Sequence, residues 1–348
     1  MSRPQVSIII PTYNRAHLIG QTLESVRRQT FSDYELVIVD DGSTDNTSGV
    51  VRELAPEARY IGQENEGIPR VLNRCILETR GEYVSFLGSD DALAPRTVEK
   101  EAALLDANPG VGIAFGPAWL MDEDGRLTHL LKPPFAAGSY VRNGREEIAD
   151  LLMSNHIVAT TVMVRRRCFE EAGLFDLRFG LYEDWNMWTR ILRRWDIGYI
   201  DEPMAFYRVH QGEAGSIFRK ADPRELARFR RMQIDEVLGD PEIAPLYRRL
   251  RRRAYARQHR VVAQQAFDRG AGWYGRWNAL QSLLANPAGA LGANGRAAAW
   301  LLAKSLAPGF ALAAGRRLKG GMSEGTRGGR ELRPSLEAIL HGAAVPEA

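Results

Sequence analysis

Two pairs of adjacent aspartates are the residues whose type and position first suggest chemistry. Asp40 and Asp41 end one apolar run. Asp90 and Asp91 end another, after a Gly-Ser turn. Adjacent carboxylates repel each other unless a ligand or a cation lies near them. One or two carboxylates combined with substrate phosphates are the usual ligands of Mg²⁺, so the pairs predict a cation–phosphate site for Mg²⁺ or Mn²⁺.

A third acidic pair, Glu183 and Asp184, precedes an apolar stripe that includes Trp185 and Trp188 and predicts a helix. The dipole at a helix N-terminus favours the charged form of a carboxylate. A charged carboxylate on a rigid element suits a general base. The alternative is that Glu183 and Asp184 only complement the positive end of the helix dipole and have no catalytic role.

Small polar and aromatic residues follow the first apolar run. Tyr13 could stack on a base and Thr12 could hydrogen-bond to it. His210 follows a strand-like run and precedes a Gly-rich turn. Taken singly, a loop tyrosine more often serves packing, and a lone histidine is usually a surface or packing residue.

Strands and helices alternate over roughly the first 120 residues, as expected of a mostly parallel sheet with helices on both faces. The predicted strands are 6–10, 35–40, 59–62, 82–87 and 111–121, and the predicted helices are 15–29, 44–55, 68–80 and 94–108. Such sheets bind ligands beyond the carboxyl ends of their strands. We therefore expect the polar clusters to meet at one edge.

The pattern changes after residue 121. An Asp-Gly pair predicts a hairpin turn within 121–127. It is followed by a predicted helix at 145–154, a strand at 157–164, a helix at 182–195 and an extended segment at 197–210.

Composition indicates ordinary globular material, with 45% hydrophobic and 26% charged residues among 348. Residues 1–220 carry 25 Lys and Arg against 32 Asp and Glu, whereas residues 221–348 carry 21 against 11. We predict a catalytic domain at 1–220, a basic helical region at 221–320 and a flexible Gly/Ser/Arg-rich tail at 321–348. Cys75 and Cys168 offer neither a disulfide framework nor a zinc spacing.

An ordered set of motifs resembles family 2 inverting glycosyltransferases with the GT-A fold. The motifs are VSIIIPTYNR, QTFSDYELVIVDDGSTD, NEG, GEYVSFLGSDDALAP, FGLYEDWNMWTRI and YRVH, between about Val6 and Ser216. The resemblance implies an α/β fold, namely a GT-A type mixed sheet flanked by helices, here with a C-terminal helical extension. It also excludes a phosphoacceptor receiver domain, which adjacent acids alone leave open.

The resemblance implies roles for individual residues. Asp184 would be the catalytic base, supported by Glu183, and Asp91 would bind the cation with His210 near it. Asp41 would accept a hydrogen bond from a uracil or thymine N–H. The other residues expected around the nucleotide are Pro11, Thr12, Tyr13, Asn14, Arg15, Gly67, Arg70, Ser89 and Asp90.

The chain departs from the family pattern at two positions. Gly88 stands where related motifs often carry an acid, which puts metal affinity in question. Leu72 stands where an arginine is often found, and Arg70, two residues earlier on the predicted helix, is our candidate replacement.

The resemblance implies inverting transfer of a sugar from a nucleoside diphosphate, most simply uridine diphosphate, to a hydroxyl of a glycan or lipid-linked acceptor. The alternative is a non-catalytic nucleotide-sugar-binding or scaffold protein of the same fold. A nucleotidyltransferase would need a Gly-rich, Lys-bearing phosphate loop after the first strand, and PTYNRAHLIG is not one.

Seven arginines lie between residues 248 and 260. The simplest explanation is that these arginines lie on a solvated helix face. The more specific explanation is that they bind an anionic membrane surface. The sequence contains no base-reading motif, so we do not predict nucleic-acid binding. No signal peptide and no apolar stretch of about 18 residues is evident, so we expect a cytoplasmic protein attached peripherally to the inner face of the cell membrane.

Overall fold

The computed structural model describes residues 3–210, 221–289, 292–306 and 334–347. The chain divides into two compact units. We call residues 1–217 with 333–348 the sheet unit, and residues 218–332 the helical unit.

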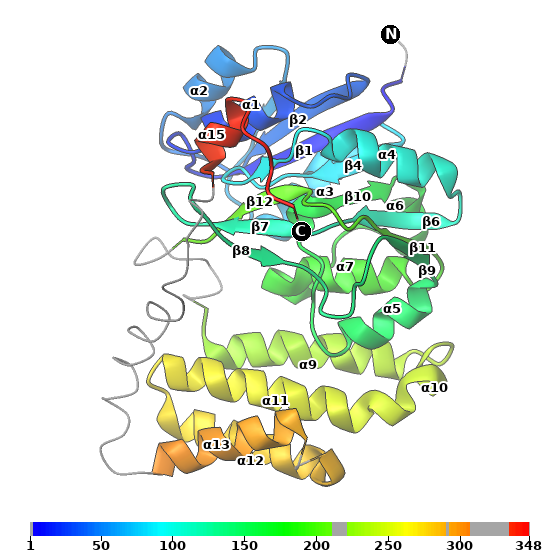
Figure 1. The fold of residues 1–348 in the computed structure, drawn as a ribbon, viewed down its shortest axis with the longest axis vertical. Helices are drawn as coiled ribbons and strands as arrows, with labels where there is room; N and C mark the ends of the chain where they lie inside the picture. The colour runs from blue at the N-terminus through cyan, green and yellow to red at the C-terminus, as the bar shows by residue number, and fades with distance from the viewer. Residues whose placement is uncertain (1–2, 211–220, 290–291, 307–333, 348) are drawn as a thin grey trace. The chain divides into compact units, whose positions relative to one another are not determined.

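The sheet unit is built on an eight-stranded sheet in the order β3-β2-β1-β4-β10-β6-β11-β9 (Figure 1). Its strands are β1 Val6–Thr12, β2 Tyr34–Asp40, β3 Arg59–Gly62, β4 Tyr83–Phe86, β6 Val111–Phe115, β9 Tyr140–Arg142, β10 Val162–Arg165 and β11 Asp196–Tyr199. Strands β3, β2, β1 and β4 run parallel, and β10 is antiparallel to both of its neighbours. The sheet is therefore mixed, as predicted.

A second sheet has the order β5-β12-β7-β8. Its strands are β5 Ala92–Leu93, β7 Ala118–Met121, β8 Leu127–Leu131 and β12 Ala205–Arg208. The single strand predicted at 111–121 was wrong, because β6 and β7 belong to different sheets. The break falls at Gly116, where a Cβ atom would lie 2.5 Å from Met204 Cγ, and at Pro117, which cannot donate to a ladder. The predicted hairpin turn is present, with Gly125 at φ +77°.

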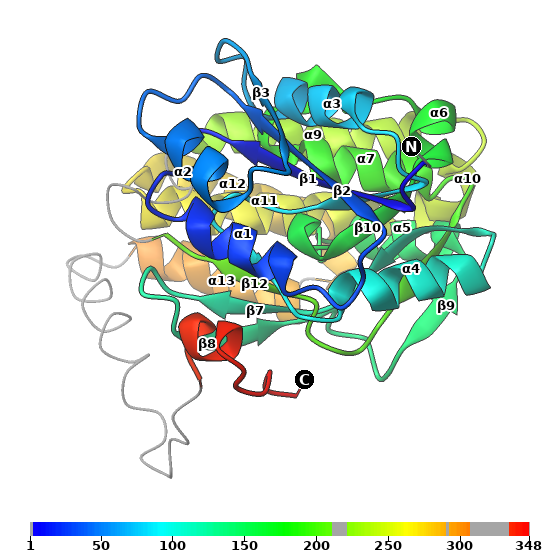
Figure 2. The same cartoon turned by 90° about the horizontal axis from the view of Figure 1, so that it is seen from above.

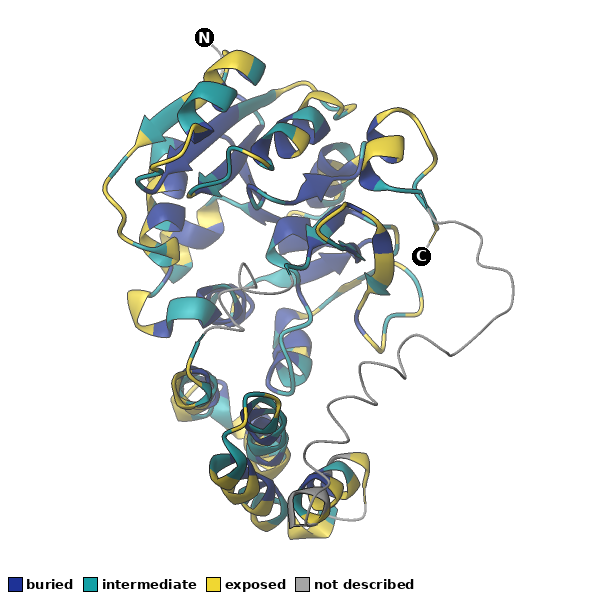
Figure 3. Ribbon diagram, turned by 90° about the vertical axis from the view of Figure 1, so that its left-hand side faces the viewer, coloured by how far each residue is buried: buried dark blue, intermediate teal, exposed yellow. Residues whose placement is uncertain are grey.

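Helices cover both faces of the main sheet, as Figure 2 shows for α1 and α3. They are α1 Ile19–Arg27, α2 Thr47–Leu54, α3 Ile68–Glu78, α4 Thr97–Ala107, α5 Gly144–Leu151, α6 Arg167–Ala172 and α7 Glu183–Ile191. The strands form the buried centre and the outer helix faces are exposed (Figure 3). The strand predicted at 157–164 begins later, because Ala159–Thr161 form a 3₁₀ turn, η1, before β10. A second 3₁₀ segment, η2 Leu177–Tyr182, precedes α7.

The end of the chain packs against the second sheet. Ser335 forms a bridge with Arg126, and helix α15, Leu336–Leu340, places Leu336, Ile339 and Leu340 in a core with Trp119 of β7. The flexible tail predicted at 321–348 therefore does not describe residues 334–347, which include the buried side chains of Leu336, Ile339 and Leu340. Residues 321–333 lie outside the described residues.

The helical unit contains α9 Pro223–Gly239, α10 Ala244–Tyr247, α11 Arg251–Asp268, α12 Gly272–Ala285 and α13 Ala293–Leu306, with 3₁₀ turns η4 Arg248–Leu250 and η5 Pro287–Gly289. Its small core joins Ala263, Ala279 and Leu301. Among the residues that the structure describes, no helix is long and apolar enough to cross a bilayer.

Candidate active site

The ends of β1, β2 and β4 carry the predicted polar clusters to one edge of the main sheet. These strands are parallel neighbours, so their carboxyl ends share that edge. Asp41 N donates to Thr12 O over 2.9 Å, which ties the second strand end to the first. The parallel order thus places Asp40 and Asp41 beside Thr12.

Asp91, which follows β4 in the chain, is buried and receives hydrogen bonds from three distant segments. Its Oδ1 accepts from Arg208 N at 2.8 Å and its Oδ2 accepts from Thr160 Oγ1. Its carbonyl accepts from Thr22 Oγ1 at 2.7 Å. Burial, together with the charge of Asp90, raises the pKa of Asp91 to about 7. An additional positive charge at this position would relieve that repulsion.

Asp90 faces two basic side chains. Its Oδ2 lies 2.7 Å from His210 Nε2 and 3.3 Å from Arg15 Nε. Burial alone would raise the pKa of Asp90, but the hydrogen bond to His210 and the charge of Arg15 outweigh it and lower the pKa below its ordinary value. Asp90 is therefore the ionised member of the pair with Asp91.

The Gly88 departure from the family pattern has a steric reason. A Cβ atom at Gly88 would lie 2.6 Å from Asp91 Oδ2, inside any normal contact distance. An acid at this position would require Asp91 to adopt a different orientation.

Glu183 and Asp184 begin α7, as predicted. Asp184 Oδ2 accepts from Asn155 Nδ2 at 3.0 Å and its Oδ1 accepts from Trp185 N at 2.6 Å. Burial raises the pKa of Asp184 to about 6, although these hydrogen bonds favour the ionised form. Burial, and next the charge of Asp184, raises the pKa of Glu183 well above its ordinary value. Within the described residues Glu183 Oε2 is buried without a hydrogen-bond partner.

Tyr207 on β12 links the acids of β4 with the acid of α7. Burial raises the pKa of its phenol, and the charges of Asp91, Asp90 and Asp184 raise it further. A group feels several charges in this way only when all of them lie near it. Hydrogen bonds give the geometric link, because Thr160 Oγ1 donates to Asp91 and Asn155 Nδ2 donates to Asp184 from one short segment before β10.

Asp41 organises the loop that precedes α3. Its Oδ1 accepts from Glu66 N at 2.8 Å and from Gln63 Nε2 at 2.9 Å, and its Oδ2 accepts from Gly67 N at 2.9 Å. Gly67 has φ +88°, a conformation suited to glycine. Arg70, in the first turn of α3, is exposed. Its predicted contact with a diphosphate stays a prediction.

Asn14 joins the loops after β1 and β2. It has φ +52°, its N–H donates to Ser43 Oγ at 2.8 Å and its Oδ1 accepts from Thr44 N at 2.8 Å. Arg15 follows and reaches Asp90. The first two strand ends are thereby connected to the third.

The remaining predicted donor-site residues lie at the same strand ends. Thr12 is buried, and its Oγ1 has no hydrogen-bond partner among the described residues. Tyr13 is 46% exposed, Pro11 lies opposite Val39 of β2, and Ser89 is buried beside Asp90. An exposed ring next to an unpaired buried hydroxyl is what a bound base could use.

Sequence reasoning missed four residues that contact or surround the acids: Asn155, Thr160, Tyr207 and Arg208. Besides its N–H bond to Asp91, Arg208 donates from Nε to Asp90 O at 2.9 Å. The motif YRVH could have drawn attention to Tyr207 and Arg208. No local sequence pattern marks Asn155 or Thr160. Their hydrogen-bond partners, Asp184 and Asp91, lie on other elements that only the fold brings close.

The described residues contain no cluster of three or more His, Cys, Asp and Glu side chains suited to a metal ion. Asp91 with Asp90 offers two adjacent carboxylates, and His210 is already bonded to Asp90. This donor set fits a Mg²⁺ or Mn²⁺ ion that completes its shell with phosphate oxygens, and does not fit an all-protein cage.

The family model of glycosyl transferase family 2 matches residues 7–173. The chain contains a glycosyl transferase family 2 domain. This match covers β1 to α6, including both aspartate pairs, and confirms the family that the motifs resemble.

Curated relatives carry the same kind of name. An uncharacterized glycosyltransferase of Rickettsia felis is 32% identical over 61% of this chain and 35% of its own length. A PGL/p-HBAD biosynthesis glycosyltransferase of Mycobacterium tuberculosis is 28% identical over 68% of this chain and 90% of its own length. The chain spans about a third to two thirds of the length of the rickettsial relatives it matches.

Solved structures confirm the GT-A type fold. TarS 1–349 of S. aureus, in complex with UDP-GlcNAc, has a TM-score of 0.57 at 17% identity, covering 91% of this chain and 92% of that one. The mannosyltransferase PcManGT of Pyrobaculum calidifontis, in complex with GDP-Man and Mn²⁺, has a TM-score of 0.55 at 20% identity, covering 98% and 86%.

Proposed function

We propose that the sheet unit transfers a glycosyl group from a nucleoside diphosphate sugar to an acceptor hydroxyl with inversion at the anomeric carbon. The observation that carries the proposal is that Asn155 and Thr160, which lie in one short segment before β10, donate hydrogen bonds to Asp184 and Asp91 respectively. One buried acid with a pKa near 6 then lies beside a second acidic cluster suited to a cation. That combination serves proton removal and charge neutralisation at one site.

The donor would lie over the ends of β1 and β2. Asp41 can accept from a base N–H while it holds the loop at Gly67, because a carboxylate has about four acceptor positions. Thr12 offers an unpaired hydroxyl and Tyr13 an exposed ring. We propose a uridine-linked donor, supported by the UDP and UDP-GlcNAc complexes of TarS.

Asp91 would hold Mg²⁺ or Mn²⁺, with Asp90 beside it and His210 near the diphosphate. Bound there, the cation would offset the negative charge that develops on the diphosphate leaving group. The complex of PcManGT with GDP-Man and Mn²⁺ supports a divalent ion in this fold.

Asp184 would accept the proton of the acceptor hydroxyl as that oxygen bonds to the anomeric carbon. The bond between this carbon and the diphosphate oxygen breaks, and the nucleoside diphosphate leaves with the electron pair. A single displacement inverts the anomeric configuration. Burial, and next the charge of Asp184, raises the pKa of Glu183, which favours a protonated Glu183 that would donate a hydrogen bond without competing as a base.

The acceptor we propose is a hydroxyl of a glycan or a lipid-linked saccharide. This acceptor class is the one that the family resemblance of the motifs implies.

The test is a panel of nucleotide sugars with the full chain and Mg²⁺, Mn²⁺ or EDTA. We expect slow hydrolysis of one uridine-linked donor, strengthened by the divalent ion and suppressed by EDTA. Donor binding without turnover under any condition, and with any acceptor tried, would support the non-catalytic binding protein instead.

A further inference from the structure

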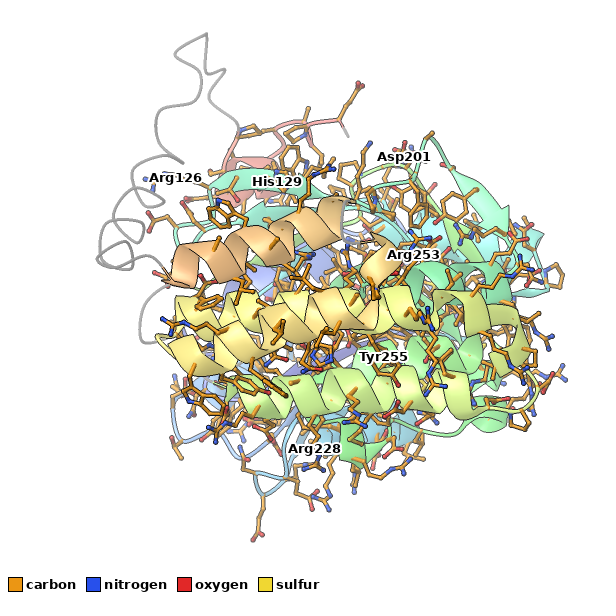
Figure 4. All side chains as sticks on the ribbon, turned by 90° about the horizontal axis from the view of Figure 1, so that it is seen from below. Arg126, His129, Asp201, Arg228, Arg253 and Tyr255 are labelled. Atoms are coloured by element: carbon orange, nitrogen blue, oxygen red, sulfur yellow. The ribbon has the colours of Figure 1, made fainter. Side chains whose placement is uncertain are left out.

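The helical unit carries a basic stripe on α9. Arg224, Arg228 and Arg231 are spaced four and three residues apart, so they lie on one helix face, and all three are exposed. Figure 4 shows the helical unit and labels Arg228 on α9. This stripe is one element of a larger surface.

A second stripe on α12 is apolar. Trp273, Trp277, Leu280 and Leu284 recur at helical spacing and are 65%, 55%, 39% and 60% exposed. Four large apolar side chains in line on one exposed face form a patch of the kind that marks an interaction site. Isolated exposed residues would need no explanation, but this alignment does.

A groove joins the two stripes. Helices α9 and α12 both pack against α11, and a cavity of about 620 Å³ lies among the three. Its lining includes the three arginines, Trp277 and, from α11, Tyr255. The guanidinium carbon of Arg224 lies 5.6 Å from the ring centroid of Trp273, so the basic and apolar stripes are continuous.

One acid also lines the groove. Asp235 accepts from the Tyr255 hydroxyl and lies 3.4 Å from Arg231 Nε. Tyr255 and Arg231 therefore compensate the charge of Asp235. Arg224 and Arg228 give the groove its positive character.

We propose that the two stripes form a docking surface for an anionic lipid bilayer. Trp273, Trp277, Leu280 and Leu284 would enter the interfacial region, and Arg224 and Arg228 would contact lipid phosphates, with Arg231 holding Asp235 beside them. An apolar face bordered by basic residues is the arrangement that interfacial helices use, and tryptophan favours the membrane–water interface. This function is separate from the proposed sugar transfer.

Charge and side-chain type select the bilayer over other occupants. A second copy of the chain would bring two basic stripes together, and like charges repel. Nucleic acid would satisfy the arginines and could stack on the tryptophans, but it offers no apolar contact to Leu280 and Leu284. An anionic lipid surface complements both stripes at once.

The experiment is sedimentation of the full chain with vesicles of phosphatidylcholine alone or with about one third phosphatidylglycerol. We expect binding to the anionic vesicles that weakens as salt rises. The triple variant Arg224→Gln/Arg228→Gln/Arg231→Gln should lose at least tenfold in affinity, since each basic residue near such a surface is worth about fivefold.

A matched variant separates this surface from overall charge. Arg249→Gln/Arg252→Gln/Arg253→Gln removes the same charge from exposed positions outside the groove lining. It should lose less than about threefold. Equal losses in the two triple variants would overturn the proposal, because only net charge would then matter.

A second pair of variants tests insertion. Trp273→Ala/Trp277→Ala should weaken vesicle binding at least tenfold, while circular dichroism and donor turnover in solution stay unchanged. In the wild-type chain, brominated lipids should quench tryptophan fluorescence, and the double variant should lose most of that quenching. Unchanged vesicle binding by the double variant would overturn the proposal, as would single-stranded DNA bound through the arginine stripe at physiological salt without vesicle binding.

Discussion

Asn155 and Asp184 are joined by a hydrogen bond, in which Nδ2 of Asn155 donates to Oδ2 of Asp184 over 3.0 Å. The donor comes from the segment between α5 and η1, and the acceptor from the first turn of α7. The bond orients the carboxylate that we propose as the catalytic base, and it favours the ionised form against the effect of burial.

Replacing Asp184 by asparagine keeps the shape of the side chain and removes the proton acceptor. We expect kcat to fall by about 10²- to 10⁴-fold, while the donor dissociation constant stays nearly unchanged. Transfer assays and calorimetric titration with the donor measure the two effects. Asp124→Asn, on the exposed hairpin turn, is the control and should keep full activity. Normal turnover by Asp184→Asn would show that another group removes the proton.

The pH profile should report the same carboxylate. Below a pH of about 6 Asp184 is protonated and cannot accept a proton, so kcat/KM should fall with decreasing pH through that value. In Asn155→Ala the ionised form loses a hydrogen bond, and the acid limb should move to higher pH by about one unit. If the acid limb of the kcat/KM profile does not move in Asn155→Ala, a group other than Asp184 causes that limb.

Gly88→Ala should disturb Asp91, because the added Cβ would lie 2.6 Å from Asp91 Oδ2. We expect activity to fall at least about tenfold, with a higher requirement for the divalent ion. Gly62→Ala at the end of β3 is the matched control, since a Cβ there meets no atom within 4 Å. Equal activities of the two variants across a titration with Mn²⁺ would contradict the packing described for Asp91.

Leu336→Ala should destabilise the sheet unit. Leu336 is fully buried in the core that contains Trp119 and Phe206, and removal of a buried leucine side chain costs about 2–5 kcal/mol. Calorimetry should show a lower Tm for the sheet unit. The exposed neighbour Glu337 replaced by alanine should change stability by less than about 0.5 kcal/mol. Identical behaviour of the two variants would mean that α15 does not pack as described.

Glu101 is a fully buried carboxyl in α4, with no hydrogen-bond partner for either oxygen among the described residues. Burial raises its pKa well above the ordinary value. The unfolded chain releases this proton near pH 4.5 and the folded chain keeps it, so the stability contribution is full below that pH and is lost as pH rises.

Glu101→Met should therefore stabilise the chain most at pH 8, and below about pH 4 the gain should shrink to the cost of burying a neutral carboxyl without a partner, roughly 1–3 kcal/mol. Urea unfolding at both pH values measures it. A gain that is the same at both pH values would attribute the effect to packing and not to titration.

The sequence by itself determined the elements that present the acids. Buried β-branched runs and amphipathic stripes specify parallel strands with covering helices, and parallel strands place their carboxyl ends on one edge. Asp41, Asp90 and Asp91 could therefore be assigned to that edge. Asp184 could be assigned to a helix start because the stripe after it has helical spacing. The proposed chemical role of each acid follows from the family resemblance and stays a prediction.

Only the tertiary structure decided which groups surround these acids. Thr160 and Arg208 reach Asp91 across 69 and 117 positions of sequence, and no local pattern encodes such a pairing. The strand predicted at 111–121 divides between two sheets because Met204 fills the space beside Gly116. The chain end returns to the second sheet because Leu336 finds a buried apolar surface there. Local periodicity determines the elements, whereas long-range packing determines the partners of each side chain.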